Sequence, residues 1–365
     1  MFFSRIAVLA ALASYATAQT STECNPMNTT CPADPALGTT YTWNFNTTLD
    51  EKIWNMKTGT YDYNDEGAQF TLRKEGESTL LQSRFYIFFG IVEAHVKMSP
   101  GRGMVSSVVL ESDDLDEIDW EWVGTNTSEV QSNFFGKGNT TSYERGGNHY
   151  VPNADTEFHN YTTYWNHDKL QWWIDGEMVR ELDYNEELTV WGKNYPQTPC
   201  QVQFSIWPAG QKKAEQGTID WAGGLVEWEN APFTMTLGKL RVEDFHTGKE
   251  YVYGDYSGSW ESIEVVSGNS TTLEELNKPE PKSLSEKWEE LGQGAHIGIY
   301  AGAASAVVLA IIGFLFFCLR QRRKGRLENA LTEAPAGENR NEMQAFQNDW
   351  RQSEWKNGGY QQVHN

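Results

Sequence analysis

Three acidic residues, Glu117, Asp119 and Glu121, stand at every second position of one stretch and together offer a set of carboxyl groups for chemistry. On a β-strand this spacing points all three side chains to one face. The residues between and after them, which would point to the other face, are large and apolar: Ile118, Trp120 and Trp122. A helix would crowd the negative charges so that they repel each other, and it would not gather the apolar residues into one stripe. We therefore expect a strand with one acidic and one apolar face.

The chemistry that this acidic face could perform is acid-base and nucleophilic catalysis at a glycosidic bond. The Cα atoms of Glu117 and Glu121 would lie ~13 Å apart along a strand, and on a concave sheet their side chains could approach each other. Carboxyl groups ~5 to 5.5 Å apart are typical of retaining glycosidases. A solvated acidic strand or a calcium site is the alternative for an acidic run of this kind.

The carboxyl groups must be positioned by a sheet of short strands. Between residues 38 and 262 apolar and polar residues alternate in short runs, for example at 91–96, 107–110 and 203–206, and Gly, Asn and Asp interrupt them. This pattern is typical of an all-β antiparallel sandwich. We find no internal repeat on the order of 20 to 50 residues, which argues against a propeller or a solenoid.

The composition of the whole chain excludes two classes of protein. The 365 residues carry a formal net charge of -21, which repels phosphate backbones and argues against a nucleic-acid partner. The chain also contains 15 Trp, 16 Tyr and 17 Phe, far more than an intrinsically disordered acidic chain would carry.

Both ends of the chain carry segments that indicate contact with a membrane. Residues 1–18 combine one basic residue, an apolar run and small residues, as in a cleaved secretory signal peptide; an N-terminal membrane anchor is the alternative. Residues 297–319 carry no charge and are long enough to cross a ~30 Å hydrocarbon core as a helix. Basic residues follow at once, namely Arg320, Arg322, Arg323, Lys324 and Arg326.

By the positive-inside rule these basic residues place the C-terminus in the cytoplasm. We expect a single-pass type I protein of the plasma membrane. Residues 19–262 would form the external sandwich, 263–296 a stalk and 320–365 a cytoplasmic tail. A glycolipid anchor is disfavoured because the polar tail follows the apolar run.

The external part carries further signs of secretion. Six N-glycosylation sequons lie before the apolar run, at Asn28, Asn46, Asn126, Asn139, Asn160 and Asn269. Cys24 and Cys31 are close enough in sequence for a short disulfide in an oxidising compartment. We interpret Cys200 as a buried thiol rather than a reactive one, and Cys318 as a candidate for palmitoylation.

The acidic strand and several other segments carry a family resemblance. Residues 117–121, with the sequence EIDWE, resemble the catalytic strand of glycoside hydrolase family 16. Together with Trp122 and six further segments, the strand is similar to the fungal Crh branch of that family, the chitin-glucan crosslinking transglycosylases. The further segments are 89–93, 100–107, 135–138, 172–176, 206–210 and 217–224. The resemblance covers residues 22 to 262.

The resemblance implies a concanavalin-like β-jelly-roll with a polysaccharide cleft on its concave face. In that cleft Glu117 would be the nucleophile, Glu121 the general acid/base and Asp119 a helper between them. Three neighbouring carboxyl groups cannot all ionise cheaply, so we expect Glu121 to keep its proton near neutral pH while Glu117 is charged. The sequence shows no motif for a metal or a cofactor, and we expect an enzyme that needs neither and is a monomer.

Aromatic and polar residues outside the acidic strand are candidates for binding the sugar chain. Trp221 lies in a turn-like stretch bounded by glycines, and its counterpart in the resemblance lies on the acceptor side, so it is the first candidate for stacking on a sugar ring. The other candidates for the cleft are Trp207, Gln131, Asn133, Tyr143, Arg145 and Trp165.

These expectations add up to an enzyme that cleaves chitin or β-glucan and transfers the cleaved chain to another polysaccharide. Two other functions remain open at this point. A plain β-glucanase or chitinase would differ only in passing the intermediate to water. A catalytically silent glycan-binding receptor would be consistent with the membrane helix and the tail.

Overall fold

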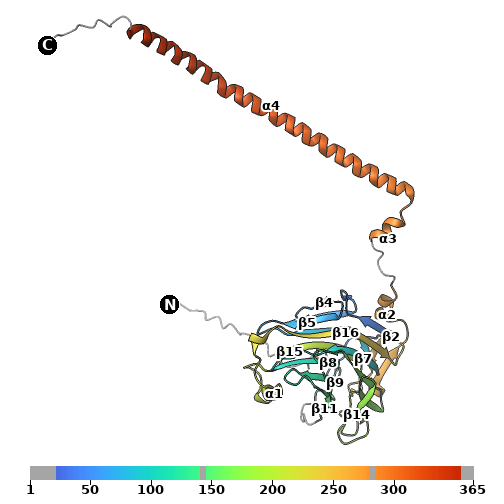
Figure 1. Cartoon of the computed structure of the whole chain (residues 1–365). Coiled ribbons are helices and arrows are strands. Elements are labelled where there is room, and N and C mark those ends of the chain that lie inside the picture. The colour runs from blue at the N-terminus through green and yellow to red at the C-terminus, as the bar shows by residue number, and fades with distance from the viewer. Residues whose placement is uncertain (1–21, 140–144, 279–283, 355–365) are drawn as a thin grey trace, which may run out of the picture. The chain divides into compact units, whose positions relative to one another are not determined.

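The computed structural model describes residues 22–139, 145–278 and 284–354, and the chain divides into two compact units, Met1–Lys278 and Pro279–Asn365. The first unit is a sandwich of antiparallel strands (Figure 1). The expected signal peptide at 1–18 and the candidate residue Tyr143 lie outside the described residues.

One layer of the sandwich is a seven-stranded sheet with the acidic strand at its third position. In spatial order its strands are β11 (Gly147–Tyr150), β10 (Glu129–Phe135), β9 (Glu117–Val123), β8 (Met104–Ser112), β15 (Cys200–Pro208), β6 (Thr79–Ile87) and β3 (Trp54–Thr58). Strand β9 is paired on both sides, so its backbone is fixed by hydrogen bonds to β8 and β10.

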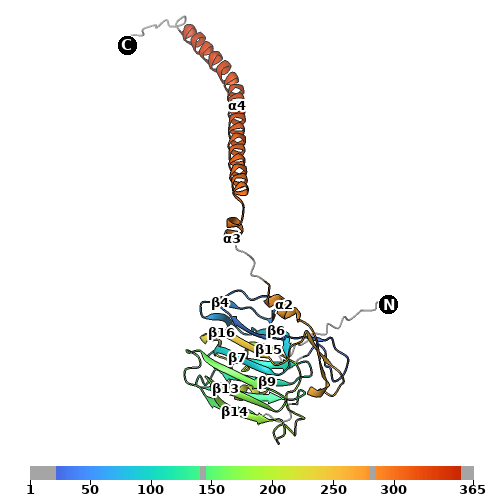
Figure 2. The same ribbon diagram turned by 90° about the vertical axis from the view of Figure 1, so that its right-hand side faces the viewer.

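The second layer is an eight-stranded sheet that packs face to face on the first (Figure 2). Its strands, in spatial order, are β14 (Glu177–Asp183), β13 (Lys169–Ile174), β12 (His159–Trp165), β7 (Gly90–Lys97), β16 (Phe233–Asp244), β5 (Gly67–Leu72) and β4 (Asp62–Asn64), with β2 (Thr40–Asn44) paired to β16. A small third sheet consists of β1 (Asp34–Pro35), β17 (Glu250–Tyr253) and β18 (Ile263–Val266). The expected all-β jelly-roll sandwich is confirmed.

Aromatic side chains fill the core between the two large sheets. Trp120 and Trp122 on β9 are buried there, and Tyr161 on β12 packs against both of them with ring centroids 5.5 and 4.5 Å away. The pair Trp172 and Trp173 could not be assigned to faces from the sequence. Trp172 lies in the core and its indole N–H donates to the backbone oxygen of Asp119, whereas Trp173 is only half-buried.

The sandwich unit extends beyond residue 262, where we expected the stalk to begin. Strand β18 completes the small sheet, and helix α2 (Thr271–Leu276) follows it. Ser270 caps α2 by accepting a hydrogen bond from the backbone of Leu273, and Leu276 packs against the core. The expected boundary was therefore too early, because the Ser- and Thr-rich composition of this stretch hides a strand and a packed helix.

The second unit is helical. It contains α3 (Leu284–Glu289) and α4 (Gln293–Glu354), a helix of 62 residues. The part of α4 from Gln293 to Asn329 contains an 18-residue window with a mean hydropathy of 2.5, and it is long and apolar enough to cross a membrane. The span expected at 297–319 lies within it. Helix α4 continues into the stretch that we expected to be the cytoplasmic tail.

Candidate functional site

The alternation of side chains along β9 is as predicted. Ile118, Trp120 and Trp122 belong to the core, so Glu117, Asp119 and Glu121 point away from it on the opposite face of the seven-stranded sheet. We call this surface the carboxylate face. Its cross-strand neighbours follow from the register: Glu117 lies opposite Glu111 and Phe135, Asp119 opposite Val109 and Asn133, and Glu121 opposite Ser107 and Gln131.

The acidic side chains are less accessible than a solvated strand would make them. Glu117 is 4% exposed and Asp119 is 1% exposed, although both point away from the core. Burial raises the pKa of Glu117 to about 7, and a hydrogen bond with Asp119 partly opposes this rise. Burial, followed by the charges of Glu117 and Glu121, holds the pKa of Asp119 well above its usual value.

Glu121 is the better proton carrier of the two glutamates. Burial raises its pKa to about 8, and the charge of Glu117 adds to the rise. Glu117 therefore ionises first, with a protonated Asp119 as its hydrogen-bond donor, while Glu121 retains its proton. A nucleophile and a general acid need this division of charge.

Two tryptophans lie beside Glu121. The indole N–H of Trp221 donates to Oε1 of Gln131 at 2.8 Å, and Gln131 is the cross-strand neighbour of Glu121. The Trp207 ring lies 6.1 Å from that of Trp221, with an angle of 31° between their planes. The structure thus brings Trp221, Trp207 and Gln131 together at the Glu121 end of the acidic strand.

Trp221 was expected in a turn, but it is the last residue of a short helix, α1 (Gln216–Trp221). Gly210, in the loop after β15, is needed for close backbone packing against Gly224, which follows α1. A Cβ on Gly210 would stand 2.1 Å from the backbone oxygen of Gly224 and 2.9 Å from the Cα of Gly103. The close contact of Gly103, Gly210 and Gly224 holds the loop after β15 against the loop after α1. This contact positions Trp207 and Trp221.

A second acidic cluster immediately precedes Glu117. The ammonium group of Lys137 lies 2.8 Å from Asp116 and 3.1 Å from Asp114, and both aspartates are fully buried. The backbone N–H of Gln197 donates to Asp116, and the Thr198 hydroxyl contacts both carboxylates. The sequence analysis missed this cluster, because Lys137 and Thr198 reach it only through the strand register.

Glu111 is a fourth carboxyl group on the carboxylate face, and the sequence analysis missed it too. It is buried directly opposite Glu117, and Nε2 of the buried Gln203 on β15 donates to it at 2.6 Å. The alternation of residues along β8 and β15 shows which side chains share a face. It does not show that Glu111 lies opposite Glu117 and contacts Gln203, because that depends on the register of β8, β9 and β15.

The remaining candidates for sugar binding have different fates. Asn133 lies half-buried opposite Asp119, as expected for the cleft. Arg145 is buried with its guanidinium 5.0 Å from the ring centre of Phe135, the neighbour of Glu117. The prediction that Trp165 lies in the cleft was wrong. Trp165 is 0% exposed on β12 in the core, where its indole N–H donates to the backbone oxygen of Pro196. Trp165 is buried because its side chain points from β12 into the core, and the residue type alone does not indicate this direction.

The cysteines behave as expected where the structure describes them. Cys24 and Cys31 form a disulfide, and Cys200 is a buried free thiol. Among the sequon residues, Asn28, Asn46, Asn126 and Asn269 are exposed, whereas Asn139 and Asn160 are half-buried. Their glycosylation and the palmitoylation of Cys318 remain predictions.

A jelly-roll sandwich with buried, unequal carboxyl groups on one face of β9 defines a protein of the glycosidase class. Residues 48–223 match the model of glycosyl hydrolases family 16. Crh-like protein 3 of Aspergillus fumigatus is 60% identical over 98% of both chains, and a Crh-like protein of Arthroderma benhamiae is 46% identical over 95% of both. The solved structure of a Crh5 transglycosylase in complex with NAG is 42% identical, with a TM-score of 0.64, and it covers 67% of this chain and 100% of its own.

The chain therefore belongs to the Crh-like proteins of glycosyl hydrolase family 16, and it is an enzyme that acts on glycosidic bonds.

Proposed function

We propose that this protein is a retaining cell-wall transglycosylase that cleaves a chain of N-acetylglucosamine units and joins it to another polysaccharide chain. The observation that carries the proposal is the placement of Glu117, Asp119 and Glu121 on one face of β9, where burial raises the pKa of both glutamates, that of Glu121 further than that of Glu117. The donor sugar is supported by the ligand in the related solved structure, in which a Crh5 transglycosylase holds NAG.

In the first step, a carboxylate oxygen of Glu117 attacks the anomeric carbon of the donor while Glu121 gives its proton to the leaving glycosidic oxygen. The glycosidic bond breaks and an ester between Glu117 and the sugar forms. Asp119, the hydrogen-bond partner of Glu117, stabilises the carboxylate before attack and again as it leaves.

In the second step, Glu121 accepts the proton of the incoming hydroxyl group, whose oxygen attacks the anomeric carbon and releases Glu117. If the hydroxyl belongs to a sugar, two chains are joined; if it belongs to water, the donor is hydrolysed. Transfer therefore requires that an acceptor sugar be held beside Glu121.

The residues next to Glu121 support acceptor binding at that end. The Trp221 and Trp207 rings offer apolar faces for sugar C–H groups, and Trp207 Nε1 is buried without a hydrogen-bond partner among the described residues. That N–H group is a donor for a sugar hydroxyl. A catalytically silent receptor is disfavoured because it would not need carboxyl groups with divided protonation.

The proposed location is the plasma membrane, with the sandwich outside the cell. The apolar part of α4 supports a single crossing, and the basic residues from Arg320 onward support a cytoplasmic C-terminus. A protease-protection assay on sealed vesicles of known orientation tests this topology: a tag placed after residue 354 should be cleaved only from the cytoplasmic side.

The activity is tested by mixing chitin hexamers as donor with fluorescent chitin or β-glucan oligomers as acceptor and analysing product lengths. We expect labelled products longer than the acceptor, together with few products of hydrolysis. Only shortened, unlabelled products would identify a plain chitinase. No turnover of either oligomer, by a folded sample, would overturn the proposal.

A further inference from the structure

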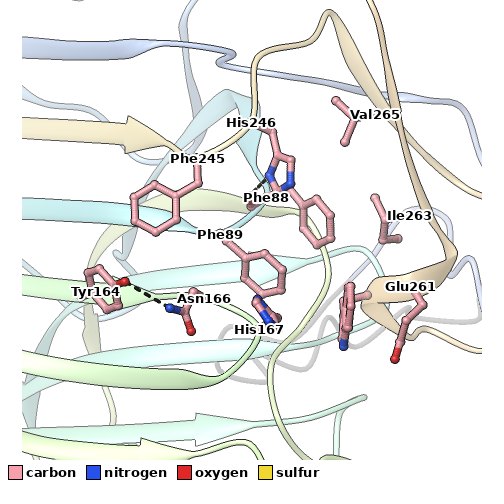
Figure 3. A pocket seen from close by; sticks show the side chains of 11 residues that line it. Phe88, Phe89, Tyr164, Asn166, His167, Phe245, His246, Glu261, Ile263 and Val265 are labelled. Atoms are coloured by element: carbon pink, nitrogen blue, oxygen red, sulfur yellow. Dashed lines mark hydrogen bonds between the residues drawn. The ribbon is translucent and has the colours of Figure 1, made fainter.

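A pocket of about 500 Å³ lies at the end of the sandwich where β6 turns into β7, β12 into β13, and β16 ends. The 3₁₀ turn η2 (Trp260–Ser262) and strand β18 close its other side (Figure 3). Its volume lies within the ~300 to 1,000 Å³ of small-molecule sites. None of the residues that line it belongs to the carboxylate face.

Aromatic rings form one wall of this pocket. The Phe88 and Phe89 rings stack with centroids 4.6 Å apart, and the His246 ring stacks on Phe88 at 4.8 Å. Phe245 continues the wall with a ring that is 38% exposed (Figure 3). Phe89 has a φ of 60°, which is a strained conformation for a bulky residue. Such a conformation persists only where the surrounding structure holds it in place.

Polar atoms with hydrogen-bonding capacity complete the pocket. The Tyr164 hydroxyl accepts from the amide of Asn166, which leaves its own O–H free to donate. His246 Nδ1 donates to the backbone oxygen of Phe88, so Nε2 is an acceptor in the neutral ring. Glu261 is exposed, and only one of its carboxylate oxygens has a hydrogen-bond partner among the described residues, the Ser259 hydroxyl.

These features select the chemistry of the ligand. The described lining contains no Lys or Arg, and its basic groups are His167 and His246, so it offers no permanent cation to a phosphate or a carboxylate. A purely apolar ligand would remove the second carboxylate oxygen of Glu261 from water without a hydrogen bond, which costs free energy. A sugar ring fits this lining, because its C–H face can stack on the exposed Phe245 ring, while its hydroxyl groups donate to the carboxylate and accept from the tyrosine.

We infer that this pocket is a second binding site for a neutral sugar unit of the polysaccharide substrate, separate from the carboxylate face; this inference rests on the proposed function. When a polymer is bound at one site, its binding at the second site is intramolecular and occurs at a high effective concentration. The affinity for the polymer therefore exceeds that of either site alone. The pocket therefore increases the affinity for long chains and leaves the turnover of short oligomers unchanged.

The test uses the full chain in detergent, with Phe245→Ala and Glu261→Gln in the pocket. Tyr63→Ala is the matched control, since Tyr63 is an aromatic residue of 49% exposure on β4, outside the pocket. Binding to insoluble chitin and to insoluble β-glucan is measured in a Glu117→Gln background, so that the polymer is not consumed. Turnover of chitin hexamers is measured with active Glu117.

We expect each pocket variant to bind the preferred polymer about fivefold more weakly, on the scale of one aromatic or hydrogen-bonded contact, with hexamer turnover and Tyr63→Ala unchanged. Wild-type affinity in both variants would overturn the inference. A loss with Phe245→Ala alone would identify an apolar ligand instead of a sugar, and an equal loss of hexamer turnover would make the pocket part of the catalytic site. Failure of the wild type to turn over hexamers would instead refute the proposed function, while the polymer-binding comparison would still decide on the pocket.

Discussion

Two clusters of carboxyl groups meet at the beginning of β9, and the main difference between them is the presence of a cation. Asp114 and Asp116 share the ammonium group of Lys137. One residue further on, Glu117 and its neighbours Asp119 and Glu121 make no ion pair with Lys, Arg or His among the described residues. The chain thus places acids in buried positions, or in a half-buried one at Glu121, and neutralises only the first set.

One stretch of acids therefore serves two purposes. In the first cluster the charges of Asp116 and Asp114 outweigh the burial that lowers the pKa of Lys137, so the lysine remains charged and the cluster acts as an ionic anchor for the turn before β9. In the second cluster only the hydrogen bond between Asp119 and Glu117 opposes the effect of burial, so the pKa values of Glu117 and Glu121 rise to about 7 and about 8 and their protons can be exchanged near neutral pH. The first set stabilises the fold, and the second is available for catalysis.

The strongest test of this comparison is Glu117→Gln set against Asp116→Asn. We expect Glu117→Gln to lower the turnover of chitin hexamers ~10³-fold or more, because the glutamine cannot form the ester. Its melting temperature should not fall, since a buried charge is removed. Asp116→Asn should show the opposite pattern, with a larger loss of stability than of activity per folded molecule. Near-normal turnover in Glu117→Gln would refute the assignment of the nucleophile.

Lys137→Met tests the anchor directly. Removing the cation leaves two buried aspartates without a neutralising charge, and we expect a loss of ~3 to 5 kcal/mol in the free energy of unfolding. The matched control is Lys52→Met, which breaks an exposed ion pair with Glu275 and should cost only ~0 to 1 kcal/mol. Denaturant unfolding followed by tryptophan fluorescence measures both. Equal effects of the two variants would show that the first cluster does not act as an anchor.

The second cluster should also be visible in the pH dependence of kcat/KM. Catalysis needs Glu117 without its proton, so activity should rise as the pH increases through its pKa of about 7. It needs Glu121 with its proton, so activity should fall above a pKa of about 8. Each limb should change the rate about tenfold per pH unit. Glu121→Gln has no proton to lose in this range, so the residual activity of this variant should show no alkaline limb; a profile without that limb in the wild type would contradict the role of Glu121.

Trp221→Ala should produce the smallest effect, because it changes the fate of the intermediate and not its formation. Losing one stacked ring costs ~1 kcal/mol, so we expect the ratio of transfer to hydrolysis to fall several-fold while cleavage of the donor continues. Trp221→Phe keeps a ring but loses the hydrogen bond to Gln131, and it separates stacking from positioning. Trp191→Ala, at a tryptophan that is 67% exposed on another loop, is the control.

The sequence predicted most of what depends on local alternation. The parity of 117–122 was sufficient to assign the acidic and apolar faces of β9, because side-chain direction on a strand repeats every two residues. The disulfide and the apolar segment of α4 were also evident from spacing and composition.

What the sequence could not provide depends on which strands become neighbours. Glu111 faces Glu117 and Lys137 reaches Asp116 only because of register between β8, β9 and β10. The error at Trp165 has the same origin, since its burial is decided by the opposing sheet. The extent of the sandwich beyond residue 262 was missed because β18 is short and pairs only with the equally short β17.

Helix α2 has a consequence for where the enzyme can work. The Ser270 hydroxyl donates to the backbone oxygen of Leu37, Leu276 packs against the core, and Lys52 pairs with Glu275, so α2 belongs to the sandwich unit, which ends at Lys278. From there to Ile297 a fully extended chain spans at most ~65 Å, and the helical turns of α3 shorten this distance. If α4 is anchored in the bilayer as proposed, the length of this connecting segment confines the catalytic unit to the layer of wall polymer next to the cell surface. Chains must then be joined as they emerge, before they move beyond its radius.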